Sequence, residues 1–246
     1  MYYNIYDYIE IKLIKKGYTM FKTELHLHSA EVSDCGRVYS QEIADIYAAH
    51  GYSTVVLANH MSKYTYLSKR NGANEHMTWK EKVDFYLDGY HKLREAANGR
   101  FNVLLGMELR LYDCLNDYLI YGITEDFLRS CDDLMAHKSI KDVKPMLEEN
   151  GFLVFQAHPF RNGMMVTNPK YIDGIEIYNG HIDHDSRNDI AELWAKKFDL
   201  LVSGGSDFHY SAQTSNAGIL TEFEIKDNKT LVEVLKNGQF TLIKGN

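Results

Sequence analysis

Short runs of aliphatic and β-branched residues alternate along the chain with helical stretches, and this alternation restricts the possible folds more than any other feature. Strands are predicted over residues 21–27, 54–58, 103–109, 118–123, 153–156, 174–178 and 200–203. Most of these runs lack polar alternation, as is typical of strands buried on both faces of a parallel sheet. Helices are predicted over residues 40–50, 75–98, 138–150, 184–198 and 230–236, and a last strand over residues 240–243.

The repeated strand-then-helix order predicts a single α/β domain. The chain has 246 residues, enough for one α/β barrel, and we expect closure into a barrel rather than an open sheet. Neither G-x-G-x-x-G nor G-x-x-x-x-G-K-[ST] follows a predicted strand, which disfavours a doubly wound nucleotide-binding fold. Residues 1–19 are predicted to be an N-terminal extension, and residues 20–246 the barrel domain.

Composition disfavours several classes of protein. There are 34 acidic and 27 basic residues, a formal charge of −7, and no basic stripe, so we expect no stable nucleic-acid binding. No run of 18 apolar residues occurs, so we expect no membrane-spanning segment. The cysteines, Cys35, Cys114 and Cys131, are odd in number and form no C-x-x-C pair. We therefore expect neither disulfides nor a thiolate zinc site, and a cytoplasmic location.

The chain has 11 histidines, and five of them lie at the ends of predicted strands. His26 and His28 end the first strand and are separated by one residue, so both side chains point to the same face. Other strand ends carry His60, Glu108, His158, Asp207 and His209. In a barrel these ends meet at the C-terminal rim, where active sites form. Imidazole and carboxylate ligands suit Zn, Fe(II) or Mn, so the sequence predicts a metal site there.

The sequence resembles the PHP family, the polymerase and histidinol phosphatase domains, in six stretches that occur in the family's order. They are ELHLHSAEVSD (24–34), VVLANH (55–60), GMEL (106–109), QAHPF (156–160), GIEIYNG (174–180) and GSDFH (205–209). The resemblance covers nearly all of the chain from residue 21. It implies a distorted (β/α)7 TIM-like barrel with two or three divalent metal ions at its C-terminal mouth, and phosphoesterase activity.

The resemblance also implies how the ligands divide among the metals. The first metal would have four ligands, His26, His28, Glu108 and Asp207. The second would have three, Asp34, His60 and His209. Glu108 would bridge to a third metal, which His158 would also bind.

The sequence departs from the family pattern at two places. Asn59 stands where family members have a carboxylate beside the metal site, and an amide still orients a ligand but carries no charge. Members also carry a further histidine on the strand after Glu108, whereas the segment here is NDYLIYGIT. Asp117 or Thr124 falls at that position, and Asp117 is the candidate ligand of a third metal.

Two or three divalent ions lower the pKa of a bridging water and clamp the oxygens of a phosphate ester. We therefore expect a metal-bound hydroxide to hydrolyse a small phosphate monoester or nucleotide, with no side-chain nucleophile. Arg161 and Asn179 are candidates for contacting this small-molecule substrate, and His181 for protonating the leaving group.

Two other functions compete with this one. An amidohydrolase-type metal hydrolase also begins with H-x-H on the first barrel strand, and a non-catalytic metal-binding PHP module would keep a partial ligand set. The sequence leaves open the phosphate ester, the metal (Zn, Mn or Fe), whether two or three ions bind, and the oligomeric state. The closing D-x-H and the early position of Glu108 favour the phosphoesterase.

Overall fold

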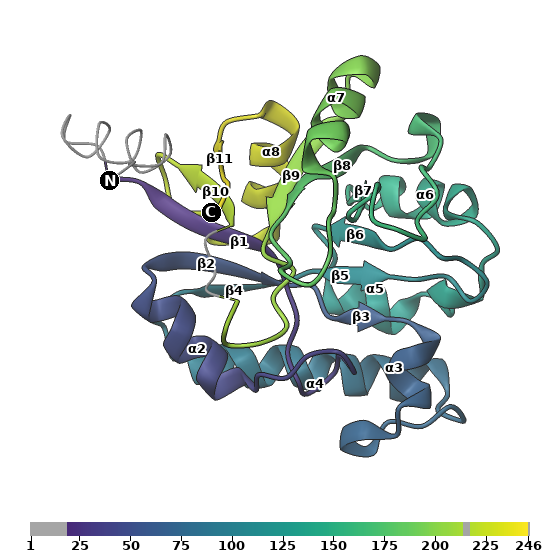
Figure 1. The fold of residues 1–246 in the computed structure, drawn as a ribbon. Helices are drawn as coiled ribbons and strands as arrows, with labels where there is room; N and C mark the ends of the chain where they lie inside the picture. Colours follow the sequence, from purple (N-terminus) through teal and green to yellow (C-terminus); the bar gives the residue numbers. More distant parts are fainter. Residues whose placement is uncertain (1–18, 214–216, 246) are drawn as a thin grey trace.

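The aliphatic runs form strands in two mixed sheets of an α/β fold (Figure 1). The computed structural model describes residues 19–213 and 217–245. The first sheet has the order β11-β10-β1-β2-β4, with strands Thr241–Ile243, Gly218–Thr221, Phe21–Leu27, Tyr52–Leu57 and Asn102–Leu105. The second has the order β3-β5-β6-β7-β8-β9, with strands His60–Met61, Met107–Leu109, Tyr118–Tyr121, Leu153–Gln156, Gly174–Asn179 and Leu201–Gly205.

The helices pack around these sheets. They are α2 (Ser40–Ala49), α3 (Lys63–Leu67), α4 (Trp79–Ala97), α5 (Glu125–Ser130), α6 (Ile140–Glu149), α7 (Asn188–Phe198) and α8 (Asn228–Asn237). Helix α4 begins after Thr78, whose side chain accepts from the backbone N–H of Glu81 in a capping box, and ends at Asn98 with φ 47°. The predicted helix over 75–98 therefore starts four residues later than expected, after a cap that the sequence contains.

The two sheets join where a predicted strand is interrupted. Residues 103–109 form two strands, β4 and β5, separated at Gly106. The backbone N–H of Gly106 donates to the carbonyl oxygen of Leu57 (3.0 Å), and the N–H of Glu108 donates to that of Asn59 (3.0 Å). A Cβ at residue 106 would lie 2.5 Å from Cγ1 of Val56, so only glycine fits this crossing without displacement. A parallel bridge between Leu27 and Phe208 joins the sheets a second time.

The strand directions correct part of the prediction. β1 and β7 have the predicted bounds, but β6 runs antiparallel to both β5 and β7, and β10 antiparallel to β1 and β11. β6 reverses because residues 110–117, between β5 and β6, contain no crossover helix. The expected parallel pairing therefore holds for part of the strands, and both sheets are mixed. In the part of the chain that the structure describes, the strands form two sheets and no closed barrel, so the TIM-like barrel stays a prediction.

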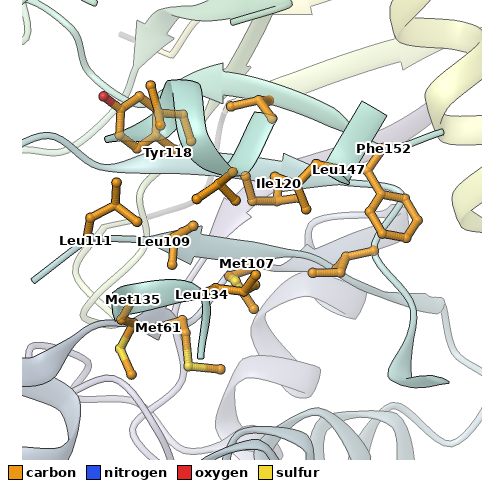
Figure 2. Packing of buried hydrophobic residues seen from close by; sticks show 14 of the residues in the cluster. Met61, Met107, Leu109, Leu111, Tyr118, Ile120, Leu134, Met135, Leu147 and Phe152 are labelled. Carbon is orange, nitrogen blue, oxygen red and sulfur yellow. The ribbon is translucent and has the colours of Figure 1, made fainter. Parts of the chain in front are cut away.

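The core consists of three hydrophobic clusters. One contains side chains from both sheets, including Leu25, Leu104, Leu119 and Phe155, together with Leu231 of α8. Another lies between the second sheet and its helices, where Met107 and Leu109 of β5 pack with Met61, Leu134 and Met135 (Figure 2). A third packs α2 and α4 against β1, β2 and β4. Because the core packs against the strands on both sides, the polar side chains at the strand ends are held at defined positions.

Two sequence-based expectations concern the chain ends and the membrane. Residues 1–18 of the predicted N-terminal extension lie outside the described residues. Within residues 19–213 and 217–245, no helix has both the length and the apolar character needed to cross a bilayer.

Candidate metal centre

Four buried side chains converge from three strand ends. His26 and His28 come from β1, Glu108 from β5 and Asp207 from the turn after β9, and one ligand atom of each lies within 4.8 Å of the others. Nε2 of His28 lies 3.2 Å from both Glu108 Oε2 and Asp207 Oδ1. Nε2 of His26 lies 3.4 Å from the same two oxygens. These are the ligands predicted for the first metal.

The outward nitrogens of these two imidazoles are held by neighbouring side chains. Nδ1 of His26 lies 2.8 Å from Glu176 Oε1, and Nδ1 of His28 lies 3.1 Å from Ser33 Oγ. A carboxylate only accepts, so Nδ1 of His26 carries a proton and Nε2 is the nitrogen that faces the cluster. Such partners fix the tautomer and the ring orientation of metal-binding histidines.

Ser33 and Asn59 fix His28 in the same way. Ser33 Oγ–H donates to Asn59 Oδ1 (2.9 Å) and accepts from the backbone N–H of His60 (3.0 Å). Because its one proton is used on Asn59, Ser33 accepts from Nδ1–H of His28. The Asn59 amide also accepts from the N–H of Ser29 (2.8 Å) and donates to its Oγ (3.1 Å). The asparagine that departs from the family pattern thus orients a ligand through Ser33.

Replacing Ser33 by alanine is expected to lower metal affinity by about 10- to 100-fold, the usual effect of removing a partner of a metal-binding histidine. The physical reason is that Nδ1 of buried His28 loses its acceptor and the ring loses its fixed tautomer. Competition with a chromophoric chelator measures the affinity. Ser130→Ala, at the end of α5, is the matched control and should leave it unchanged; equal affinities in both variants would contradict this role of Ser33.

A second group of imidazoles lies beside the first. His28, His60 and His209 place ligand atoms within 4.8 Å of one another. Nδ1 of His60 lies 2.9 Å from Glu108 Oε2, and Nε2 of His209 lies 2.9 Å from Cys35 Sγ. Asp34, the predicted third ligand of this site, has an exposed side chain and joins none of the ligand groups found among the described residues. Cys35, the next residue, is also outside these groups, but its Sγ faces His209 of this second group.

The remaining predicted ligand, His158, faces the other oxygen of Glu108. Its Nε2 lies 3.0 Å from Glu108 Oε1 and 3.8 Å from Asp117 Oδ2. Asp117, the candidate ligand of a third metal, is fully buried, and with His60 and Glu108 it forms another group of close ligand atoms. Asp117 is also paired with two arginines. Arg110 donates to it through Nε and Nη2 at 2.5 Å each, and Arg161 through Nη2 at 3.3 Å.

The buried polar atoms of this cluster fit divalent ions. Among the residues that the structure describes, Nε2 of His26, Nε2 of His28 and Oε2 of Glu108 are buried and make no hydrogen bond. Leaving such atoms unpaired costs free energy, and a cation is the partner that imidazole lone pairs and a carboxylate oxygen share. Nitrogen and oxygen donors of this kind bind Zn, Mn or Fe.

Two of the candidate ligands have unusual backbone conformations. His158 has φ 29° and Asp207 has φ 49°, in the left-handed region that non-glycine residues rarely occupy. Glu176 Oε2 accepts from the N–H of His158 (2.9 Å), and Asn179 Nδ2 donates to Asp207 Oδ2 (3.1 Å). Each strained residue costs of the order of 1–3 kcal/mol, and such residues cluster at functional sites. The strain turns both side chains toward Glu108 and the histidines.

An open pocket of about 320 Å³ lies above the ligands, with a positively charged wall. Its arginines are Arg37, Arg110 and Arg161, and its histidines include His181 and His184. Arg161, predicted from the sequence, donates through Nη1 toward His184 Nε2 (3.2 Å). Arg110 was missed, although it follows Glu108 by two residues and so points to the same face of the strand.

The structure gives Asn179 a different setting from the one expected. Its Nδ2 donates to Glu176 Oε2 (2.9 Å) as well as to Asp207, and its Oδ1 accepts from the N–H of His181 (3.1 Å) and from Ser186 Oγ (3.2 Å). The side chain is buried and these contacts use both of its polar atoms. Asn179 therefore orients Asp207, which the sequence did not indicate.

The charges of the cluster shift several pKa values. Burial alone would lower the pKa of His26, but Asp207 and Glu176 hold it well above its usual range. Burial would also lower the pKa of His60, but the negative charges of Glu108 and then of Cys35 outweigh burial and raise it. Burial lowers the pKa of His184 to about 4 and also lowers that of His181. Without metal, the cluster thus binds protons on His26 and His60, while His181 and His184 are neutral at pH 7.

These shifts predict a stability maximum near pH 6.5 for the chelator-treated protein. In the unfolded chain a histidine has a pKa of about 6.5. The raised pKa values of His26 and His60 therefore stabilise the folded protein fully below about pH 6.5, and this stabilisation is lost as the pH rises through the pKa values of the folded state. The lowered pKa values of His181 and His184 stabilise it above about 6.5, and that contribution is lost as the pH falls toward 4.

Melting temperatures across this pH range, with chelator and with saturating metal, test the prediction. Metal replaces the protons on His26 and His60, so the loss above pH 6.5 should disappear when metal is present. His184→Gln should reduce the loss at acidic pH, whereas a profile with no maximum in chelator would contradict the shifts.

One family model matches part of the chain. The chain matches the PHP-associated family model over residues 185–240, which include Asp207 and His209. No curated protein matches the chain.

Three solved structures are similar in fold. One is a two-domain protein from Bacteroides vulgatus that contains a predicted PHP-like metal-dependent phosphoesterase, with 19% identity and a TM-score of 0.66 over 93% of this chain and 66% of that one. Another is an amidohydrolase from Chromobacterium violaceum (16% identity, TM-score 0.50, 79% of this chain and 89% of that one). A third is Endonuclease Q in complex with duplex DNA that carries an abasic lesion (12% identity, TM-score 0.58, 89% of this chain and 57% of that one).

This chain spans slightly less than two thirds of the Bacteroides protein and little more than half of Endonuclease Q. At these identities the likeness concerns the fold. The names of the three proteins specify three different activities, so the choice of reaction depends on the residues of the site.

Proposed function

We propose that this chain is a metal-dependent phosphoesterase of the PHP family, which hydrolyses a small phosphate monoester or a nucleotide; its residues 185–240 match the PHP-associated family model. One observation carries the proposal. The buried group of His26, His28, Glu108 and Asp207, with its unpaired nitrogens and oxygen, opens into a pocket lined by arginines.

The candidate ligands have distinct places in this proposal. His26, His28, Glu108 and Asp207 would hold one divalent ion, and His60 and His209 a second, with Glu108 between them. His158 and Glu108 would hold a third, if one binds. Bound ions would supply a water that is activated near neutral pH and positive charge on the phosphoryl oxygens.

The arginines of the pocket supply further positive charge. Arg110 and Arg161 both donate to Asp117, which fixes their guanidinium groups at the rim. Arg161 also donates through Nη1 to His184, and each guanidinium carries further N–H groups. A planar guanidinium with several donors suits the oxygens of a phosphate. We assign these two arginines to binding the phosphoryl group and stabilising the charge that develops on it.

His181 has the donor that a leaving group needs. Its Nδ1 accepts from the backbone N–H of Asp183 (3.1 Å), so the neutral ring carries its proton on Nε2. Burial lowers the pKa of this ring, which is therefore neutral at pH 7. We propose that His181 donates a hydrogen bond to the leaving oxygen, a milder role than the general acid expected from the sequence.

The size of the pocket supports a small substrate. A volume of about 320 Å³ lies at the lower end of the range for small-molecule sites. The net charge of −7 is unfavourable for holding a long polyanion, whereas metal ions and arginines within the pocket outweigh it locally. This favours a monoester over the duplex DNA bound by Endonuclease Q.

Release of inorganic phosphate tests the proposal. Aryl phosphates, sugar phosphates and nucleoside monophosphates would be assayed with Mn²⁺ or Zn²⁺ and with chelator, alongside amides, lactones and an abasic DNA duplex. We expect metal-dependent turnover of at least one monoester. Turnover of only amides or lactones would support an amidohydrolase-type enzyme, and cleavage of only the duplex an endonuclease; both results would overturn the proposal. A chain inactive on every substrate, yet still binding metal, would fit a non-catalytic module.

A further inference from the structure

Cys35 lies in the loop after β1, and its thiol faces the second group of imidazoles. Its Sγ is 2.9 Å from Nε2 of His209. Nδ1 of His209 lies 2.7 Å from the backbone carbonyl oxygen of Asp207, an atom that only accepts. His209 therefore carries its proton on Nδ1 and directs the Nε2 lone pair toward the sulfur. A thiol and an imidazole nitrogen, two ligand types that bind zinc, thus lie side by side.

A second imidazole independently indicates a ligand at this place. Nε2 of His28 is fully buried and makes no hydrogen bond within residues 19–213 and 217–245. The ligand atoms of His28, His60 and His209 lie within 4.8 Å of one another. Cys35 and His60 also line the same two pockets. The sulfur of Cys35 therefore lies against His209, one of three imidazoles whose nitrogens are close together.

The loop conformation selects Cys35 rather than Asp34 for this place. Nη1 of Arg70 donates to the carbonyl oxygens of Asp34 (2.9 Å) and Gly36 (2.7 Å), so it holds the backbone on both sides of Cys35. The N–H of Arg37 donates to the carbonyl oxygen of His209 (2.7 Å). With the loop held in this way, the carboxylate of Asp34 is exposed and the thiol of Cys35 points inward.

We propose that Cys35 binds the second metal ion as a thiolate, together with His60 and His209, and that this ion belongs to the Zn²⁺ or Fe²⁺ class. The inference rests on the metal centre of the proposed function. It replaces Asp34 in the predicted ligand set and departs from the sequence-based expectation of no thiolate site. Thiolate ligands favour Zn and Fe over Mg and Mn, which prefer oxygen. On binding, the thiol proton passes to solvent.

Cobalt substitution tests the ligand directly. The chelator-treated protein would be titrated with Co²⁺ and followed by absorption, since a thiolate bound to cobalt gives a charge-transfer band in the near ultraviolet. We expect the band in the wild type and in the control Cys114→Ser, and its loss in Cys35→Ser. A wild type that binds cobalt without the band, or a Cys35→Ser protein that keeps it, would overturn the inference.

Two further measurements keep the inference falsifiable if Cys35→Ser does not fold. In the double variant Cys114→Ser/Cys131→Ser, Cys35 is the one remaining thiol, and Zn²⁺ should slow its alkylation; an unchanged rate would count against ligation. Cys35→Asp should bind as many cobalt ions as the wild type, without the band, and with a preference shifted toward Mn²⁺. A Cys35→Asp protein that keeps the band or prefers zinc as the wild type does would contradict the proposal.

These readouts do not depend on turnover. A protein with the band but no phosphoester hydrolysis would retain Cys35 as a ligand and refute the phosphoesterase. An active protein without the band would support the phosphoesterase and refute Cys35 as a ligand.

Discussion

Replacing Glu108 by glutamine is expected to lower kcat/KM for a phosphate monoester by about 1,000-fold. Oε2 of Glu108 lies 2.9–3.4 Å from ring nitrogens of His26, His28 and His60, and Oε1 lies 3.0 Å from His158. One carboxylate therefore serves every candidate ion of the centre. Loss of its charge should cost about 4 kcal/mol of transition-state stabilisation, at 1.36 kcal/mol for each factor of ten.

Steady-state kinetics and elemental analysis of bound metal measure this effect together. Glu233→Gln, on the exposed face of α8, is the matched control and should retain wild-type kinetics. The Glu108 variant should also hold fewer metal ions. Wild-type kinetics in Glu108→Gln would place the reaction outside this cluster.

Replacing Arg110 by alanine is expected to lower kcat/KM by about 100- to 1,000-fold, the effect of removing one donor to a developing negative charge. The guanidinium lines the pocket and is fixed by its two-point contact with Asp117. Arg110→Lys should recover only part of the loss, because an ammonium group keeps the charge but not the planar pair of donors.

The matched control for this prediction is Arg100→Ala. Arg100 pairs with Asp45, away from the pocket, and its loss should leave the kinetics unchanged. Because Asp117 is buried, the melting temperature of Arg110→Ala must be measured as well. A folded Arg110→Ala protein with wild-type kcat/KM would show that Arg110 does not contact the substrate.

The ligands were predictable from the sequence because strand geometry is regular. In β1, alternation alone brings His26 and His28 to one face. The other candidate ligands lie on β3 and at the ends of β5, β7 and β9. The same rule applied to Glu108 would have found Arg110. The clustering of these residues in the structure agrees with the set chosen from the sequence, apart from Asp34.

What the sequence did not predict depends on loops and on contacts between distant segments. Whether Asp34 or Cys35 points inward is decided by Arg70, which lies 35 residues further along the chain than Cys35. The reversal of β6 follows from a connection that contains no helix, and the break at Gly106 from its close approach to Val56. The secondary-structure propensities of neighbouring residues do not depend on such long-range contacts, so they could not predict them.

The candidate metal centre spans the junction between the two sheets. His26 and His28 belong to β1 of the first sheet, whereas Glu108 and Asp207 belong to strands or turns of the second. An ion held by all four would bind only while both sheets are folded, and so would link their unfolding into one cooperative transition. Amide hydrogen exchange in the two sheets should then slow together on metal addition, and metal supply would set the lifetime of the folded chain.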